Sequence, residues 1–301
     1  MANPTLPVRS IASLRGVNAN GVADSLNARV AVRGTVMSHN ISANGMQYVI
    51  RDNTGGITIF RSSGNFGLGA LAIGDSVWAQ GTVAQFNGLT QISMSSANGD
   101  TCVLVATGRP IPAPLVVPTV SESTENELVR VDSLQIVSGT WPAAGSTSSA
   151  NIIVRSVNDT TNTFTVRVIA NGTNLAGNAP TTPVFSMVGV GGQFDNSSPF
   201  TSGYQLFPRS AADIIPVVAT VQAQITLQVD MDTFTVRAGG VRVAGNFNGW
   251  NPASASAVMT RVGTSSIYQR TITLNAGDTI QYKFLRDSLW SGEELVPTAC
   301  G

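Results

Sequence analysis

Apolar and polar residues alternate with a period of two along most of this 301-residue chain. The longer period of an amphipathic helix is almost absent. Alternation of this kind places every second side chain on the buried face of a strand, so the pattern predicts an all-β protein. In the first third, strands are expected at residues 29–37, 46–52, 56–61, 76–85 and 89–95.

Turn residues separate these expected strands. Asn-Gly pairs at 44–45 and 87–88 favour tight hairpins, and Asp52-Asn53-Thr54-Gly55-Gly56 favours a slightly longer one. The connection between the third and fourth strands is longer than the others. Five short strands with this spacing are typical of an OB barrel.

A proline-rich stretch at 109–118 follows, and because proline favours extended backbone we expect a semi-rigid linker there. The next block repeats the first more loosely. Its strands are expected at residues 128–137, 151–158, 163–169, 187–193 and 203–208. The matching order and spacing indicate an internal duplication.

A third region begins near residue 218, with strands expected at 224–229, 242–244, 267–274 and 279–285. The predicted fold class is therefore all-β, with two OB-like Greek-key barrels in tandem and a C-terminal immunoglobulin-like β-sandwich. The expected domains are 1–110, 111–217 and 218–301.

The composition argues against a disordered chain, a nucleic-acid partner and a membrane span. Charged residues make up 11% of the chain, the formal net charge is zero, and 43% of residues are hydrophobic, which argues against disorder. Residues 1–110 hold seven Arg and four Asp, and this net charge of +3 is small for a domain that binds a polyanion. Nucleic acid is therefore not expected as a partner, and no apolar run is long enough to span a membrane.

Residue types that carry catalysis are scarce. The single histidine, His39, lies in a polar stretch that favours a surface or turn position, and no nucleophile elbow or phosphate-binding loop is recognisable. Cys102 and Cys300 are too few and too distant for a metal motif, and their spacing leaves open whether they pair. We expect a protein that is not an enzyme and that has no cofactor or metal.

The third region carries the most informative motif. Residues 245–252 read Gly-Asn-Phe-Asn-Gly-Trp-Asn-Pro, and Tyr282-Lys283-Phe284 and Trp290 follow. This pattern resembles the starch- and glycogen-binding immunoglobulin-like modules, such as that of the AMP-activated protein kinase β subunit. The resemblance implies that Trp250 and Trp290 are sugar platforms and that Lys283 contacts sugar hydroxyls. Such modules have a further strand after the second tryptophan, which we expect this domain to lack.

The first region resembles OB-fold domains of the nucleic-acid-binding type, on residues 32–36, 48–60 and 74–81. In such folds the second and third strands form the binding face. The resemblance makes Tyr48, Arg51, Phe60 and Arg61 candidate contacts, since aromatic rings stack on bases and arginine contacts phosphates. The alternative is that Tyr48 and Phe60 pack the barrel or a domain interface.

Tandem OB-like units before a glycogen-module-like domain resemble secreted multidomain proteins of Bacteroidetes-type bacteria. The leading hypothesis is a secreted or cell-surface, non-catalytic module array that binds α-glucan-like polysaccharide by aromatic stacking. A second hypothesis is a structural subunit of a surface fibre or adhesin, in which copies of the chain assemble by β-strand addition. A third is single-stranded nucleic-acid binding by the OB-like domains.

Overall fold

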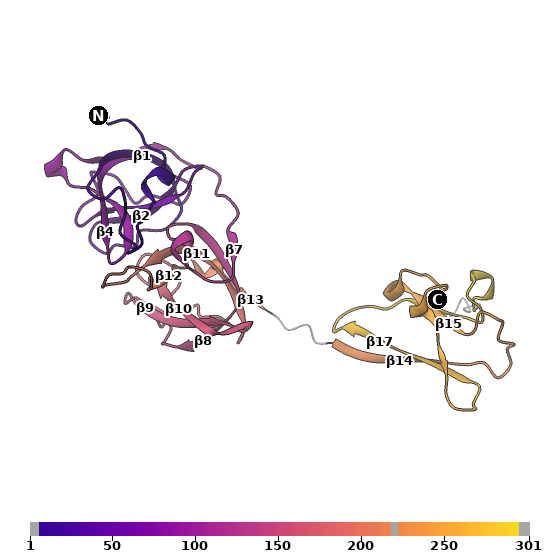
Figure 1. Cartoon of the computed structure of the whole chain (residues 1–301). Coiled ribbons are helices and arrows are strands. Elements are labelled where there is room, and N and C mark those ends of the chain that lie inside the picture. The colour runs from indigo at the N-terminus through magenta and orange to yellow at the C-terminus, as the bar shows by residue number, and fades with distance from the viewer. Residues whose placement is uncertain (1–5, 218–221, 295–301) are drawn as a thin grey trace. The chain divides into compact units, whose positions relative to one another are not determined.

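The computed structural model describes residues 6–217 and 222–294. The chain forms two compact units, Met1–Val218 and Ala219–Gly301, which are described separately. Figure 1 shows that strands dominate both units, as the alternating pattern predicts. The fold is all-β, and the helical elements in the described ranges are short 3-10 turns. These are η1 (Ile11–Leu14), η2 (Ser96–Asn98), η3 (Glu122–Thr124), η4 (Ala211–Asp213), η5 (Asn246–Asn248), η6 (Ala255–Ala257) and η7 (Trp290–Gly292).

The first half of unit 1 is a closed five-stranded barrel. Its strands are β1 (Arg29–Val36), β2 (Met46–Arg51), β3 (Gly56–Arg61), β4 (Ser76–Phe86) and β5 (Leu89–Ser93). They pair in the order β1-β2-β3-β5-β4, and β4 pairs back to β1 to close the barrel. The pairing of β3 with β5 is parallel and the others are antiparallel, which is the strand order of an OB fold.

The second half of unit 1 is a barrel of the same strand order. Its strands are β8 (Leu128–Ser138), β9 (Ala150–Ser156), β10 (Asp159–Val168), β11 (Phe185–Gln193) and β12 (Tyr204–Phe207). They pair in the order β8-β9-β10-β12-β11, with β11 closing onto β8 and a parallel pairing of β10 with β12. The two barrels are therefore copies of one topology.

The duplication extends to strands outside each barrel. β6 (Thr101–Ala106) pairs with β4, and β13 (Ile214–Pro216) pairs with the equivalent strand β11. β7 (Leu115–Val117) lies parallel to β8, and Val8 forms the equivalent parallel bridge to β1. The expected linker at 109–118 thus contains a short strand. Its residues 115–117 are not proline, so their backbone N–H groups can donate to β8.

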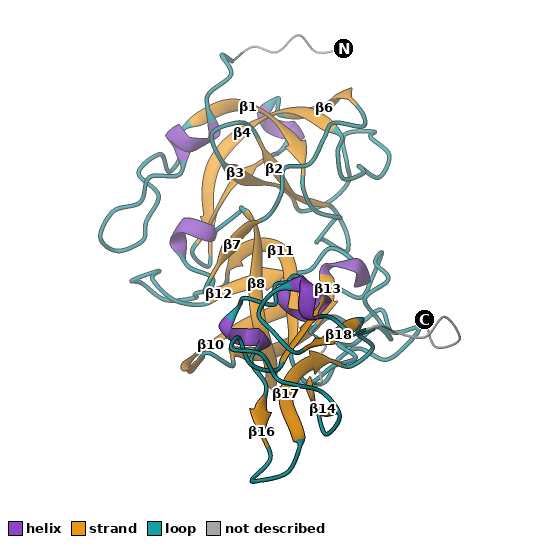
Figure 2. Ribbon diagram, turned by 90° about the vertical axis from the view of Figure 1, so that its right-hand side faces the viewer, coloured by secondary structure: helices purple, strands orange, loops and turns teal. Residues whose placement is uncertain are grey.

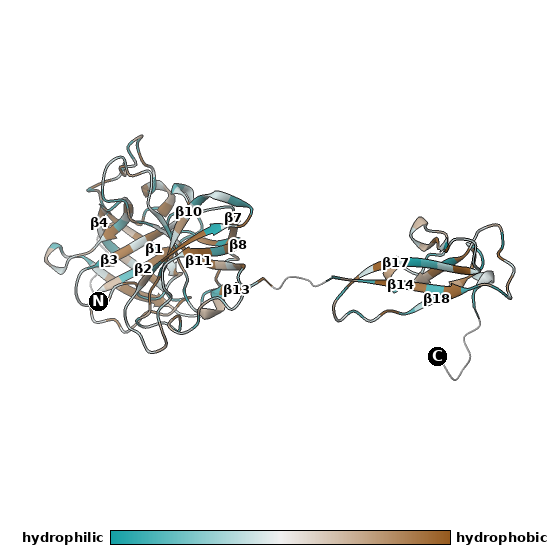
Figure 3. Ribbon diagram, turned by 90° about the horizontal axis from the view of Figure 1, so that it is seen from below, coloured by the Kyte–Doolittle hydropathy of each residue, from teal (hydrophilic) through white to brown (hydrophobic). Residues whose placement is uncertain are grey.

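Each barrel has its own apolar core, and a third cluster joins them. Ile50, Ile57, Ile59 and Ile92 lie in the first core, and Leu134, Ile152 and Phe185 in the second. A seam of Met37, Val49, Leu128, Val188 and Val190 is buried between the two barrels. Figure 3 shows hydrophobic and hydrophilic residues side by side on the strands, as expected where one face of a strand is buried.

Unit 2 holds two small sheets around one core. β14 (Gln222–Asp230), β17 (Ile267–Asn275) and β16 (Thr260–Arg261) form the larger sheet (Figure 2). In the smaller sheet, β15 (Arg242–Gly245) pairs with β18 (Tyr282–Leu285). Leu227, Met231, Val241, Val243 and Ile272 are buried in this core. The expectation that this domain lacks the further strand of such modules concerns residues 295–301, which lie outside the described residues, as does Cys300.

Candidate functional site

Two tryptophans form the most exposed aromatic contact of unit 2. The ring centroids of Trp250 and Trp290 lie 6.3 Å apart, with the ring planes tilted by 32°. Trp250 is 38% exposed and Trp290 41%, so each indole keeps much of its surface free while contacting the other. The structure thus brings together two residues that are 40 positions apart in the sequence.

The turn before Trp250 is held by side-chain hydrogen bonds. The backbone N–H of Gly245 donates to Asn248 Oδ1 at 2.9 Å, and Asn248 Nδ2 donates to the carbonyl of Val243 at 2.9 Å. Trp250 itself has φ of 57°, in the left-handed region. For a bulky side chain this conformation costs on the order of 1 kcal/mol and recurs at functional sites. Within the same motif, Phe247 packs against the core, so the two aromatics have different roles.

Trp290 and Lys283 come from neighbouring segments. Trp290 begins η7, and the backbone N–H of Glu293 donates to its carbonyl at 3.0 Å. Lys283 on β18 places its Nζ 3.0 Å from Glu293 Oε2. The ammonium is therefore tied to the segment that carries Trp290, and a hydroxyl-bearing ligand would compete with that carboxylate.

The OB-like face differs from the sequence-based prediction. Tyr48 is 3% exposed and packs in the core of the first barrel, where its hydroxyl accepts a hydrogen bond from the backbone N–H of Leu71. Burial raises the pKa of Tyr48 above its ordinary value. The Tyr48 ring cannot stack on a ligand in this position, and the packing alternative describes it correctly.

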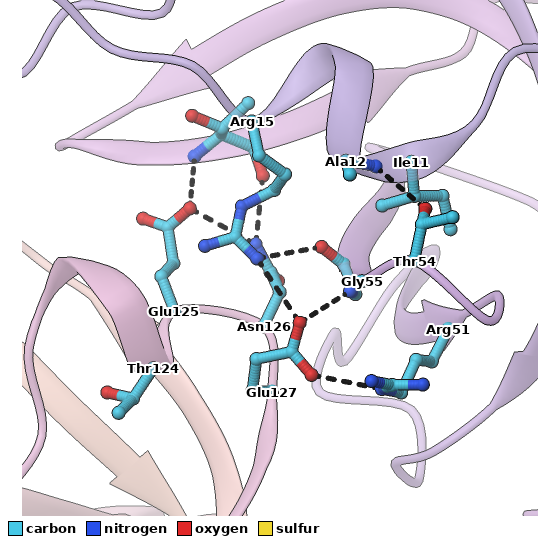
Figure 4. Close-up of polar contacts among 12 residues, drawn as sticks. Ile11, Ala12, Arg15, Arg51, Thr54, Gly55, Thr124, Glu125, Asn126 and Glu127 are labelled. Carbon is cyan, nitrogen blue, oxygen red and sulfur yellow. Dashed lines mark hydrogen bonds and ion pairs between the residues drawn. The ribbon is translucent and has the colours of Figure 1, made fainter.

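Arg51 is also withdrawn from that face. Figure 4 shows it beside Glu127 of the second barrel, and its Nε lies 3.0 Å from Glu127 Oε2. The other carboxylate oxygen accepts from the backbone N–H of Gly56 at 2.9 Å and lies 3.8 Å from Arg15. Arg51 therefore joins the barrels, and the partner residue could not be read from local sequence because it lies 76 positions away.

Phe60 and Arg61 keep more solvent contact. Phe60 is half-buried at the end of β3. The guanidinium carbon of Arg61 lies 4.0 Å from the ring centroid of Phe66, and its Nη1 donates to Ser96 Oγ at 2.7 Å. Of the four residues expected on one face, Tyr48 thus lies in a core, Arg51 lies at the interface of the barrels, and Phe60 and Arg61 lie at the half-buried end of β3.

The segment 125–127, here called the polar plug, packs against strands β3 and β5 of the first barrel. Asn126 is fully buried, accepts from Thr58 Oγ1 at 2.6 Å, and donates through Nδ2 to the carbonyl of Thr90 at 3.2 Å. Its backbone N–H donates to the carbonyl of Gly191 in its own barrel. Glu125 is 1% exposed, and burial raises the pKa of its carboxyl to about 8. This plug and the apolar seam fix the two barrels as one unit.

The single histidine and the one cysteine within the described residues are at least partly buried. His39 is half-buried, not on the open surface as expected, and burial lowers its pKa to about 4 despite the nearby Asp213. Cys102 is a buried free thiol, and burial raises its pKa to about 12.

Over residues 6–217 and 222–294, no group of three or more His, Cys, Asp and Glu side chains is arranged to hold a metal ion. Within those same ranges, no helix has the length and hydrophobicity needed to cross a membrane.

No protein-family model and no curated protein matches this chain. Among solved structures, it is similar to the hypothetical protein ygiW from E. coli, at 20% identity and a TM-score of 0.26, over 34% of this chain and 94% of that one. It is also similar to a murine DNA binding protein bound with double-stranded DNA, at 10% identity and a TM-score of 0.29, over 63% of this chain and 97% of that one. Fission yeast Pot1 with single-stranded DNA matches at 12% identity and a TM-score of 0.27, over 69% of this chain and 85% of that one.

Two of these structures contain DNA, which contradicts the expectation that nucleic acid is not a partner, and that expectation is withdrawn. Similarity at these identities and TM-scores does not transfer to this chain what those proteins bind. The OB-like assignment of the two barrels rests on their own strand order and closure.

Proposed function

We propose that this chain is a non-catalytic, secreted or cell-surface protein that binds neutral, α-glucan-like polysaccharide through Trp250 and Trp290. The observation that carries the proposal is the exposed indole pair, held on a turn whose backbone adopts a costly conformation at Trp250. A packing role would bury the rings, whereas these two keep about two fifths of their surface open. The apolar face of a sugar ring stacks on such a surface.

The expected affinity is modest. If each indole buries roughly 80 Å² against a sugar at about 25 cal/mol/Å², it contributes about 2 kcal/mol. Two rings give about 4 kcal/mol before association costs, which corresponds to millimolar dissociation constants. Binding at low concentration therefore needs repeated contacts along a polymer.

Replacing Trp250 tests the proposal. In Trp250→Ala, loss of one platform is expected to weaken the binding of a linear α-glucan oligosaccharide about tenfold to thirtyfold. Titration followed by tryptophan fluorescence and by NMR shift changes measures this. Leu289→Ala is the matched control. Leu289 precedes Trp290 in the sequence and is an exposed apolar residue, but it is not part of the ring pair. Equal binding by the wild type and Trp250→Ala would count against the proposal.

We also propose a second function, assembly of copies through strand addition at β14. In the described ranges this nine-residue strand pairs with β17 on one side, and no strand pairs with its other side. Its residues 222–229 are uncharged, whereas exposed edges are commonly protected by charge or proline. An unprotected edge offers hydrogen bonds to a strand of another copy.

The assembly proposal predicts filaments of concentrated wild-type protein in negative-stain electron microscopy. Ile225→Lys places a charge on the partly exposed edge and should abolish the filaments, whereas Leu289→Lys should not. Single particles of uniform size at every wild-type concentration would remove the support for assembly.

A further inference from the structure

A pair of phenylalanines is exposed where loops of the two barrels meet. Phe86 ends β4 and Phe194 directly follows β11, the equivalent strand of the second barrel. Their ring centroids are 6.4 Å apart in an edge-to-face contact, yet Phe86 is 59% exposed and Phe194 53%. Burial of each ring against the other thus leaves more than half of both rings in solvent.

The pair has a duplicated sequence signature. Each phenylalanine follows a glutamine, in Gln85-Phe86 and Gln193-Phe194. Gln85 Nε2 donates to the carbonyls of Gly21 and Gly88, and Gln193 Nε2 donates to those of Phe200 and Ser202. In both barrels the glutamine amide fastens the loop beside the exposed ring, so the arrangement is built twice in the same way.

The loops that carry the rings are locked together. The backbone N–H of Asp195 donates to the carbonyl of Asn87 at 2.7 Å, and that of Phe200 donates to Asn20 at 2.9 Å. The Asp195 carboxylate accepts from Ser202 Oγ at 2.8 Å and from two backbone N–H groups. A ligand would therefore meet rings that are already in place, which lowers the entropy cost of binding.

The surroundings are electrically neutral. Residues 18–22, 85–89 and 193–203 contain one charged residue, Asp195, which is 8% exposed. Most of the other residues in these three segments are glycine or carry an amide or hydroxyl side chain. Ring faces with neutral hydrogen-bonding neighbours match a hydroxyl-rich, uncharged ligand, and they offer no cation to a polyanion.

We infer that Phe86 and Phe194 form a second polysaccharide-binding surface, on unit 1, which takes the same neutral glucan chains as the indole pair of unit 2. This inference rests on the proposed function for the class of ligand. With one surface on each unit, a single long polymer can contact both, and linked weak sites raise the apparent affinity without new contacts.

The test uses the full chain and two probes, a short linear α-glucan oligosaccharide and a long immobilised α-glucan. The double variant Phe86→Ala/Phe194→Ala should weaken retention on the long polymer about tenfold or more. It should leave the tryptophan fluorescence titration with the short probe unchanged. Leu115→Ala, a similarly exposed apolar residue of unit 1, should behave as the wild type, and thermal melting checks that all variants fold.

The outcomes separate the two proposals. If Trp250→Ala changes nothing but the phenylalanine variant loses polymer retention, the indole proposal fails and the unit 1 surface stands. Unchanged retention of the phenylalanine variant overturns the present inference, whatever Trp250→Ala does. Loss of single-stranded DNA binding or of self-association in that variant, with glucan retention intact, would assign the rings to those partners and also overturn it.

Discussion

Gly56→Ala is expected to destabilise unit 1 by more than about 3 kcal/mol or to prevent its folding. A Cβ at this position would overlap the backbone carbonyl of Asn126, which belongs to the polar plug of the second barrel. Neither backbone can give way easily, because Asn126 is fully buried and hydrogen-bonded to both barrels. The new methyl group would push the barrels apart and expose the seam.

Thermal unfolding with near-ultraviolet circular dichroism measures this effect, because Trp78 and Trp141 report on unit 1. Gly69→Ala is the control: an added Cβ there meets no atom within 4 Å, and the backbone is not in the left-handed region. Its stability should stay within about 1 kcal/mol of the wild type. A melting temperature for Gly56→Ala equal to that of Gly69→Ala would refute the close packing of the plug.

The stability of unit 1 is expected to fall between pH 6.5 and 8, and Glu125→Gln should remove most of that fall. Burial raises the pKa of Glu125 to about 8 from an ordinary value of 4.5, although the Arg15 charge acts in the opposite direction and Glu122 adds to the rise. In this interval the folded protein holds a proton that the unfolded chain has lost. The stabilisation is complete below pH 4.5, declines as the pH rises, and is lost above about 8, for a total of up to about 5 kcal/mol.

Urea unfolding at several pH values from 6.5 to 8.5 measures this slope. His39 does not interfere there, because its lowered pKa, about 4, makes its contribution change between pH 4 and 6.5, with stability lost as the pH falls. Glutamine keeps the shape of the side chain, so it can retain the hydrogen bonds that Glu125 Oε1 accepts from the backbone N–H of Thr90 and from Asn126 Nδ2. Figure 4 shows Glu125 beside Asn126. Parallel slopes for the wild type and Glu125→Gln would show that the carboxyl ionises normally.

Strand positions could be predicted from the sequence, because each barrel strand alternates and is bounded by turn residues. All five strands expected in each barrel are present, with ends shifted by a few residues. The peripheral strands β6, β7 and β13 were not predicted. Their residues are largely exposed or half-buried at the edges of sheets, so they do not show a strong alternation.

The roles of the face residues could not be predicted, because β2 is buried on both sides. Tyr48 and Ile50 point into the barrel core, while Val49 between them packs in the seam with the second barrel. Three successive buried residues hide which side faces out. The resemblance named Trp250, Trp290 and Lys283 as candidate site residues. It specified neither the contact between the two indole rings nor the ion pair of Lys283 with Glu293. The repeated Gln-Phe dipeptide was a visible signal of the phenylalanine pair.

The seam has a consequence for how the two copies can diverge. After a duplication, each half normally drifts independently, but here Met37 and Val49 of one copy are packed against Val188 and Val190 of the other. A larger side chain on one side is tolerated only with a smaller one opposite. Related sequences should therefore change these positions in compensating pairs, and neither half should occur as a stand-alone protein while it keeps this apolar surface.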